Sequence, residues 1–367
     1  MLGLPKNYFG NLLRLLGGNP TLRPLVATFY LTAQCNLNCV YCEDFGVRRN
    51  PRNDRPLTLD EAKHVLRTIR TGMDSLILTG GEPLLVPYLE ELVSYARQEL
   101  RFRQLTLLTN GALLAGRERL LAMLDRVVIS LDSVDASYWS GVIGVPVQVA
   151  ETILQNLHWA AEQQRKLGFV LVINCVLTPQ TLPGAGQVLD FCREHDILAA
   201  FSPQAVHHWP LYDVLISKAY VDFLDQLIHE KKVGGPVLGS WAYLYALRRF
   251  ETFACYPTLN PRIWADGSLT FPCRPIERDG GEHGGRPCRL QDVTTWEEAL
   301  VLALQRYGQP PQTCTSCFQQ CYLEFVDRLA TYGHLIDPET MGLIDDGIAV
   351  VMRSEEHTSE LQSPNTI

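Results

Sequence analysis

The stretch LVATFYLTAQCNLNCVYC, residues 25–42, begins with an apolar, partly β-branched run and continues directly into a loop that carries three cysteines. The run over residues 25–31 predicts a buried strand. The thiols of Cys35, Cys39 and Cys42 follow where that strand ends. A functional loop at the carboxyl end of a strand is typical of α/β folds whose active face collects the loops that follow the strands.

Outward from this strand, short apolar runs alternate with longer helical patterns. Further strands are expected over residues 75–79, 105–109, 126–131, 169–177 and 197–201. A capping box of Thr58 and Glu61 opens the first intervening helix. Repeated βα units form a parallel sheet, and six units are too few for a closed eight-stranded barrel. We therefore predict an α/β fold, a partial (β/α)6 TIM-like barrel.

The sequence changes character after Lys232, where Gly234, Gly235 and Pro236 indicate a linker before a Cys-rich region with a hairpin turn at Asp266 and Gly267. We predict an N-terminal extension over residues 1–24, the barrel over 25–233 and a smaller Cys-rich domain over 234–340. Residues 353–367, RSEEHTSELQSPNTI, resemble the translation of a sequencing-adapter oligonucleotide. We expect this tail to be an assembly artefact that packs on nothing.

Composition narrows the class of protein. The formal net charge of the 367 residues is −8, and the basic clusters are only two residues long, so nucleic acid is not an expected partner. The sequence shows no membrane span, because no apolar run approaches the ~18 residues that one needs. It also shows no secretory signal, which places the protein in the cytoplasm. Eleven cysteines in that compartment indicate metal binding or catalysis rather than disulfides.

Cys35, Cys39 and Cys42 are spaced so that three thiolates can converge on one face of their loop. Thiolates are the usual ligands of iron–sulfur clusters, and three ligands on a four-iron cluster leave one iron open for a substrate or cofactor. A zinc knuckle is the alternative, but zinc knuckles favour two-residue spacers and four ligands.

The CxxxCx-aromatic-C pattern of this loop, with Tyr41 as the aromatic residue, resembles the signature of the radical S-adenosylmethionine superfamily. The resemblance implies that the open iron of a 4Fe-4S cluster binds the methionine part of S-adenosylmethionine. It also implies reductive cleavage of that cofactor to a 5'-deoxyadenosyl radical, which abstracts hydrogen from a substrate. A reductant such as flavodoxin or ferredoxin would supply the electron, and Tyr41 would lie near the adenine.

The residues Gly80, Gly81, Glu82 and Pro83 end the second expected strand and resemble the GGEP motif of that superfamily, which contacts the methionine amino group. Two glycines permit positive φ and a close approach of backbone to a ligand. By itself, such a sequence is also an ordinary turn before a helix. Its position on the strand that follows the cysteine loop favours the functional interpretation.

Ser130 and Asp132 share one face of the fourth strand and resemble the residues that contact the ribose in this superfamily. The alternative for Asp132 is a cap on the following turn. Asn174 is a polar residue amid apolar inward positions of the fifth strand, where related proteins place a polar residue against the cofactor. The turn at Thr109, Asn110 and Gly111 also matches, but turn chemistry explains it equally well, and we assign it no catalytic role.

A second group of cysteines resembles the SPASM or twitch auxiliary-cluster domains that follow many radical barrels. Six thiolates cannot fully ligate two four-iron clusters, so we predict one auxiliary 4Fe-4S cluster, with zinc as the alternative. Its candidate ligands are Cys255, Cys273 and two of the group Cys314, Cys317 and Cys321. The role of Cys288 is left open. Cys175 and Cys192 are expected to be small core residues.

The substrate is less determined than the chemistry, and both peptides and small biosynthetic molecules remain candidates. Only 34 residues precede Cys35, too few for a leader-binding domain of the kind that peptide maturases carry. The paired C-terminal Gly-rich and Arg pattern expected of a molybdopterin-type cyclase is also missing. A non-catalytic iron–sulfur or zinc protein on a barrel scaffold is the rival class, but such a protein has no need of the GGEP and Ser-x-Asp residues.

Overall fold

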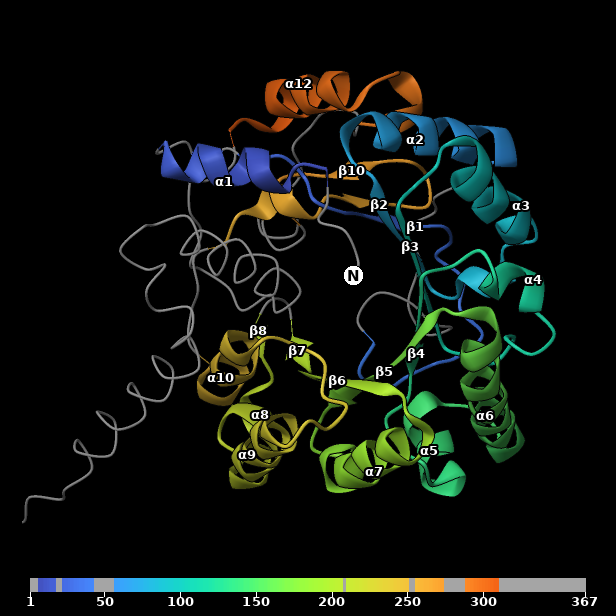
Figure 1. The fold of residues 1–367 in the computed structure, drawn as a ribbon, viewed down its shortest axis with the longest axis vertical. Helices are drawn as coiled ribbons and strands as arrows, with labels where there is room; N and C mark the ends of the chain where they lie inside the picture. The colour runs from blue at the N-terminus through green and yellow to red at the C-terminus, as the bar shows by residue number, and fades with distance from the viewer. Residues whose placement is uncertain are drawn as a thin grey trace, which may run out of the picture.

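The computed structural model describes residues 6–17, 22–42, 56–206, 209–250, 255–273 and 288–309. Its central feature is a curved sheet with the strand order β10-β9-β1-β2-β3-β4-β5-β6 (Figure 1). The parallel strands are β1 Ala27–Tyr30, β2 Ser75–Thr79, β3 Gln104–Thr109, β4 Arg126–Ser130, β5 Val170–Leu177 and β6 Leu198–Pro203. Within the described residues β10 and β6 form the two edges, so the sheet is an open barrel. The six predicted strands, their parallel arrangement and the partial barrel are confirmed.

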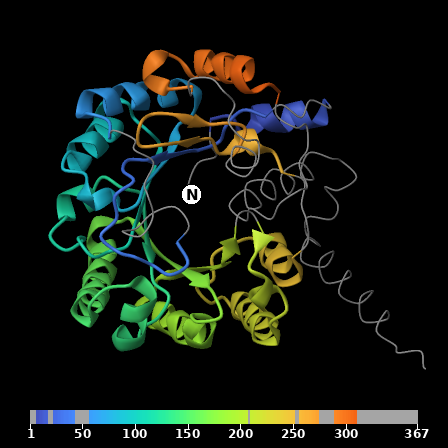
Figure 2. The same ribbon diagram turned by 180° about the vertical axis from the view of Figure 1, so that it is seen from behind.

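Helices cover the outer side of this sheet, which Figure 2 shows from behind. Those that connect the parallel strands are α2 Leu59–Gly72, α3 Leu89–Ser94, a π-helical turn Tyr95–Glu99, α4 Glu118–Leu121, α5 Ala136–Ile143, α6 Val147–Leu167 and α7 Ala185–His195. The remaining α-helices among the described residues are α1 Tyr8–Leu16, α8 Tyr212–Leu215, α9 Lys218–Lys232, α10 Trp241–Arg249 and α12 Trp296–Tyr307. The predicted capping box forms at α2, where Thr58 and Glu61 each accept a hydrogen bond from the other's backbone N–H.

The core lies between the sheet and these helices. The side chains of Leu76, Leu107, Ile129 and Ile173 point outward from four neighbouring strands and are fully buried. Strands of a parallel sheet are buried in this way because the crossover helices cover their outer face. Cys175 of β5 belongs to the same layer and Cys192 of α7 faces it, both fully buried, which confirms them as core residues.

Elements from the region predicted as a separate Cys-rich domain continue the barrel. Strand β9, Arg262–Ile263, pairs in parallel with β1, and β10, Leu269–Thr270, pairs antiparallel with β9 as the predicted hairpin. Helix α12 lies on α2, where the Trp296 ring occupies the space beside Gly72 so closely that a Cβ there would lie 2.5 Å from it. The hairpin is confirmed, whereas the domain boundary at residue 234 stays a prediction.

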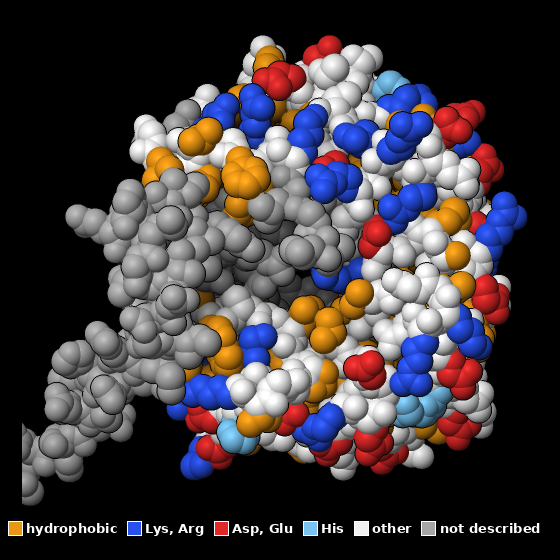
Figure 3. Space-filling model, in the orientation of Figure 1, with side chains coloured by type: hydrophobic (Ala, Val, Ile, Leu, Met, Phe, Trp, Pro, Cys, Tyr) orange, Lys and Arg blue, Asp and Glu red, His pale blue; other side chains and the backbone are white. Residues whose placement is uncertain are grey.

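Helix α1 lies at the β10 end of the sheet and buries only one of its sides. Tyr8 and Leu12 are buried, while Phe9, Leu13 and Leu16 are each at least 60% exposed. Figure 3 shows hydrophobic side chains over this helix at the upper left. Among the described helices, none has the length and apolar character needed to cross a membrane. The predicted ligands Cys314, Cys317 and Cys321 and the tail over residues 353–367 lie outside the described residues.

Candidate active site

The three-cysteine loop leaves β1 and is anchored on α5. The backbone N–H groups of Asn38 and Val40 donate to the carbonyl oxygens of Ile143 and Val142, both at 2.9 Å. Gly144 ends α5 with φ 65° and lets the loop come close, since a Cβ there would lie 2.6 Å from the Asn38 carbonyl oxygen. These contacts give the loop a fixed path at the carboxyl ends of the strands.

Cys35, Cys39 and Cys42 are half-buried on this loop. Burial raises the pKa of the Cys35 thiol and raises the pKa of Cys39 to about 12. The charges of nearby groups raise both pKa values further, Glu82 and Cys42 acting on Cys35, and Asp132 and the other two thiols acting on Cys39. In each case a neighbouring negative charge disfavours the ionised thiol. A bound metal centre reverses this effect, because a coordinated thiol is deprotonated outright.

A three-thiolate donor set suits an iron–sulfur cluster chemically, since cysteine is the usual ligand of such clusters. Within the parts of the chain that the structure describes, no three His, Cys, Asp or Glu side chains form a site for a single metal ion.

The GGEP turn is built against the segment that leads into this loop. The N–H groups of Gly81 and Glu82 donate to the carbonyl oxygens of Thr32 and Gln34, both at 2.8 Å. A Cβ on Gly80, whose φ is 153°, would lie 2.6 Å from the Thr32 carbonyl oxygen, and one on Gly81 would lie 2.2 Å from that of Gln34. Only glycine fits at these contacts. Pro83 then opens the short 3₁₀ helix η1, Pro83–Leu85.

Glu82 is fully buried, and its carboxylate faces the protein. It accepts hydrogen bonds from Leu84 N at 2.9 Å, Thr109 Oγ1 at 2.8 Å and Asn110 N at 2.7 Å. Burial raises its pKa, and these donors lower it. Because each partner is a donor, the ionised carboxylate satisfies them all. Glu82 thus joins the end of β2 to the end of β3, and a direct contact with a cofactor stays a prediction.

Asp132 is also fully buried, just beyond the end of β4. Its Oδ2 accepts from the Tyr41 hydroxyl at 2.5 Å and from Trp139 Nε1 at 3.5 Å, and its Oδ1 accepts from Val176 N at 2.8 Å. Burial raises the pKa of Asp132, and it raises that of Tyr41 well above its ordinary value. The structure brings these two predicted site residues together as a buried pair. The predicted ribose contact of Asp132 stays a prediction.

Ser130 and Asn174 face the inside of the open barrel, as the strand pattern predicts. They are register partners on β4 and β5, and both are only partly buried. Ser202 on β6 donates to Asn174 Oδ1 at 3.4 Å. A row of polar side chains therefore crosses three neighbouring strands near their carboxyl ends, and its contact with a cofactor stays a prediction.

Asn110 is a site residue to which the sequence argument assigned no role. Its Nδ2 donates to Asn36 Oδ1 at 2.7 Å and reaches Cys35 Sγ at 3.9 Å. The available signal was its position directly after β3, because the carboxyl ends of parallel strands meet at one edge. The preference of Asn-Gly for turns explained Asn110 equally well, so its position alone did not indicate a role at the site.

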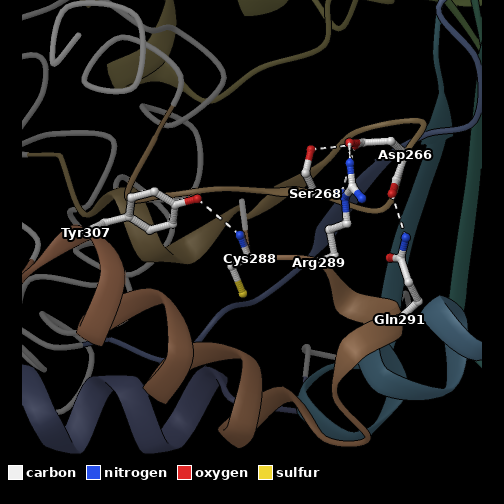
Figure 4. A network of polar contacts seen from close by, with 6 residues as sticks. All are labelled: Asp266, Ser268, Cys288, Arg289, Gln291 and Tyr307. Atoms are coloured by element: carbon white, nitrogen blue, oxygen red, sulfur yellow. Dashed lines mark hydrogen bonds and ion pairs between the residues drawn. The ribbon is translucent and has the colours of Figure 1, made fainter. Parts of the chain in front are cut away.

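The three described cysteines of the C-terminal region, Cys255, Cys273 and Cys288, are all buried. Cys288 is held as a core thiol: its Sγ donates to the Ala299 carbonyl oxygen at 3.6 Å, and burial raises its pKa to about 11. Its backbone N–H donates to the Tyr307 hydroxyl at 3.2 Å (Figure 4). The auxiliary cluster itself stays a prediction, because its last three proposed ligands lie outside the described residues.

The hairpin turn next to these cysteines carries a polar network centred on Asp266 (Figure 4). Asp266 Oδ1 accepts from Ser268 N and Oγ, and its Oδ2 accepts from Arg289 at 3.1 Å. Gln291 Nε2 donates to the Asp266 carbonyl oxygen at 2.7 Å. These bonds fasten residues 289–291 to the β9–β10 hairpin, and through it to the barrel sheet.

Curated relatives match about half of this chain. GTP 3',8-cyclase of Mycobacterium sp. (strain KMS) is 36% identical over 213 residues, which cover 52% of this chain and 59% of the cyclase. The GTP 3',8-cyclase of Mycolicibacterium smegmatis is 35% identical over 206 residues, covering 53% of this chain and 55% of that protein. The chain thus spans less than two thirds of the length of these relatives.

Solved structures share the fold over more of the chain. Streptococcus suis SuiB bound to its precursor peptide SuiA aligns with a TM-score of 0.59 and 20% identity, covering 78% of this chain and 67% of SuiB. The structure of anSMEcpe with bound AdoMet aligns with a TM-score of 0.56 and 16% identity, covering 88% of this chain and 98% of anSMEcpe. Residues 29–191, which hold the cysteine loop, the GGEP turn, Ser130, Asp132 and Asn174, match the Radical SAM superfamily.

Proposed function

We propose that this chain is a radical SAM enzyme that uses S-adenosylmethionine and a 4Fe-4S cluster held by Cys35, Cys39 and Cys42. The observation that carries the proposal is the close assembly of the cysteine loop and the GGEP turn. Gly81 and Glu82 donate to the backbone immediately before Cys35, and the two glycines leave no room for side chains. A purely structural metal site has no need of this second motif.

When bound, the cluster supplies the electron that cleaves S-adenosylmethionine to methionine and a 5'-deoxyadenosyl radical. The chain's own residues bind and orient S-adenosylmethionine and exclude water from it. Tyr41 is fixed by Asp132 at 2.5 Å, so its ring has one orientation in which to flank the adenine. Ser130 and Asn174 offer hydroxyl and amide groups inside the barrel to the ribose and to the methionine part.

The substrate is proposed by class only. The relatives by sequence are named as GTP cyclases, which act on a small molecule, whereas SuiB is solved with a precursor peptide. We propose a peptide or a small biosynthetic intermediate, with flavodoxin or ferredoxin as reductant. An untargeted comparison of peptides and metabolites, incubated anaerobically with and without the reduced enzyme, separates the two classes.

The test of the proposed chemistry is production of 5'-deoxyadenosine by anaerobically reconstituted protein under dithionite. Replacing Cys39 by Ala leaves two thiolates in the loop, so production should fall to background. Cys192→Ala is the matched control, because Cys192 is a fully buried core residue of α7, and production should stay within about twofold of wild type.

A third variant, Cys273→Ala, tests the auxiliary region separately. It should retain cleavage of S-adenosylmethionine, because the residues that hold the cofactor lie in the barrel, even if turnover of substrate is lost. Undiminished cleavage by folded Cys39→Ala protein would overturn the proposal. So would wild-type protein that binds iron or zinc and never cleaves S-adenosylmethionine, which is the behaviour of the rival class, a non-catalytic metal protein.

A further inference from the structure

The side-chain amide of Asn110 has one defined orientation. Its Oδ1 accepts a hydrogen bond from the backbone N–H of Ala112 at 3.0 Å, and a backbone N–H can face only an acceptor. The Nδ2 group must therefore face the other way, toward the cysteine loop. The residue is buried, with 8% of its surface exposed.

The two hydrogens of this Nδ2 group serve two acceptors on the loop. Asn36 Oδ1 lies at 2.7 Å and Cys35 Sγ at 3.9 Å, the longer distance being that expected of a weaker bond to sulfur. The backbone N–H of Leu37 also donates to Cys35 Sγ at 3.5 Å. The Cys35 sulfur thus receives two N–H donors, one of them from the turn that follows β3 and is distant in sequence.

The backbone of Asn110 is fixed as firmly as its side chain. Its N–H donates to Glu82 Oε2 at 2.7 Å, and Glu82 Oε1 accepts from the preceding residue, Thr109. Asn110 therefore links the buried Glu82 to Cys35. Its backbone N–H bonds Glu82, and its side-chain Nδ2 bonds the Cys35 sulfur. Such groups behind a metal ligand orient it and adjust the properties of the metal centre.

We propose that Asn110 is a positioning residue whose amide N–H, donated to the Cys35 sulfur, makes the barrel cluster easier to reduce. This deepens the proposed function and rests on it, since it requires that Cys35 ligates a 4Fe-4S cluster. Reduction adds one electron to the cluster and its sulfur ligands. An N–H donor stabilises that added negative charge, and hydrogen bonds to the sulfurs are among the factors that set the potentials of such clusters.

The experiment is a redox titration of reconstituted protein followed by electron paramagnetic resonance, with iron counted in each sample. Asn110→Ala removes the donor, so at a fixed applied potential the ratio of reduced to oxidised cluster should fall about tenfold, equivalent to about 59 mV for one electron. Asn110→Asp keeps the bond from Ala112 and replaces the donor by a charged acceptor. Its ratio should fall further.

Asn156→Ala is the matched control. Asn156, also buried, donates from Nδ2 to the carbonyl oxygens of Gly111 and Ala112 in the same turn, at 2.9 and 3.1 Å. Among the described residues, it makes no hydrogen bond to the cysteine loop over residues 35–42. Its ratio should stay within about twofold of wild type. If Asn110→Ala fails to fold, Asn110→Ser gives the same comparison, because its hydroxyl can serve Ala112 while being too short to reach Cys35.

The outcomes separate this inference from the proposed function. If fully iron-loaded Asn110→Ala has the wild-type ratio of reduced to oxidised cluster, the inference is overturned. An equal fall of this ratio in Asn156→Ala also overturns it, because the effect would then come from the turn rather than from the Asn110 donor. Loss of the cluster from all folded Asn110 variants also overturns it. Wild-type protein that assembles no reducible cluster overturns the proposed function instead.

Discussion

Glu82 and Asp132 are both fully buried carboxylates at the carboxyl ends of strands, yet the protein surrounds them differently. Glu82 accepts from two backbone N–H groups and one threonine hydroxyl, which come from η1 and from the end of β3. Asp132 accepts its shortest bond, 2.5 Å, from the hydroxyl of Tyr41 in the cysteine loop, 91 residues away in sequence. Its other close donor is a single backbone N–H, that of Val176.

The difference indicates two separate tasks. Backbone donors move only with the elements that carry them, so Glu82 joins the ends of β2 and β3, on which the cysteine loop lies. Asp132 holds the loop itself, because Tyr41 lies between two of the cysteines. Loss of the Glu82 charge should therefore disturb the whole active end of the barrel, whereas changes around Asp132 should act mainly on the loop.

The largest expected effect is that of Glu82→Gln. The amide keeps one acceptor oxygen but turns an NH₂ group toward a backbone N–H, so a buried donor loses its partner and a charge-assisted bond is lost. We expect the free energy of unfolding of the apoprotein to fall by about 3 kcal/mol, measured by urea denaturation. Iron incorporation on reconstitution should fall with it. Wild-type stability and iron content in Glu82→Gln would show that the junction of β2 and β3 does not depend on this carboxylate.

The next largest effect is expected for Tyr41→Phe, which keeps the ring and removes the hydroxyl. Asp132 then keeps Val176 N and the long bond from Trp139, so a buried carboxylate loses its main donor. The free energy of unfolding should fall by about 2 kcal/mol. Combining Tyr41→Phe with Asp132→Asn gives a double-mutant cycle, and a coupling energy of at least about 1 kcal/mol is expected for two groups in contact. If the losses of the two single variants simply add up in the double variant, Tyr41 and Asp132 do not stabilise one another.

The affinity for S-adenosylmethionine, measured for variants of Tyr41, distinguishes the role of its ring from that of its hydroxyl. If the ring flanks the adenine, the phenylalanine variant should retain binding within about tenfold of wild type, whereas Tyr41→Ala should lose more. Equal affinities for both variants would assign the role to the hydroxyl alone.

The sequence predicted the barrel because its signals are local. Alternating apolar runs mark each strand, and the capping box of Thr58 and Glu61 marks the start of α2 within four residues of chain. The strand face of Ser130 and Asn174 followed from the same two-residue period. These features depend on neighbours in the sequence and need no knowledge of the tertiary structure.

The sequence could not predict contacts that join distant segments. Neither the turn of Glu82 toward Asn110 nor the bond from Tyr41 to Asp132 follows from a motif, because each partner lies on another strand or loop. The pairing of β9 with β1 is a similar case: Thr28 donates to Asn260, 232 residues away, and so brings the Cys-rich region onto the barrel edge. Motifs identify the residues of a site, whereas the fold decides which way each side chain points.

The smallest expected effect, and the sharpest comparison, comes from Thr109→Val. This nearly isosteric change removes one donor from Glu82, as Tyr41→Phe removes one from Asp132, but Glu82 keeps two backbone N–H donors at 2.9 and 2.7 Å. It also removes the acceptor for Gly111 N at 3.1 Å. We expect the free energy of unfolding to fall by about 1 kcal/mol, less than for Tyr41→Phe. Thr106→Val, on the same strand, controls for the loss of a buried hydroxyl remote from Glu82. If Thr109→Val costs as much as Tyr41→Phe, the side-chain donor rather than the backbone holds Glu82, and the two carboxylates perform the same task.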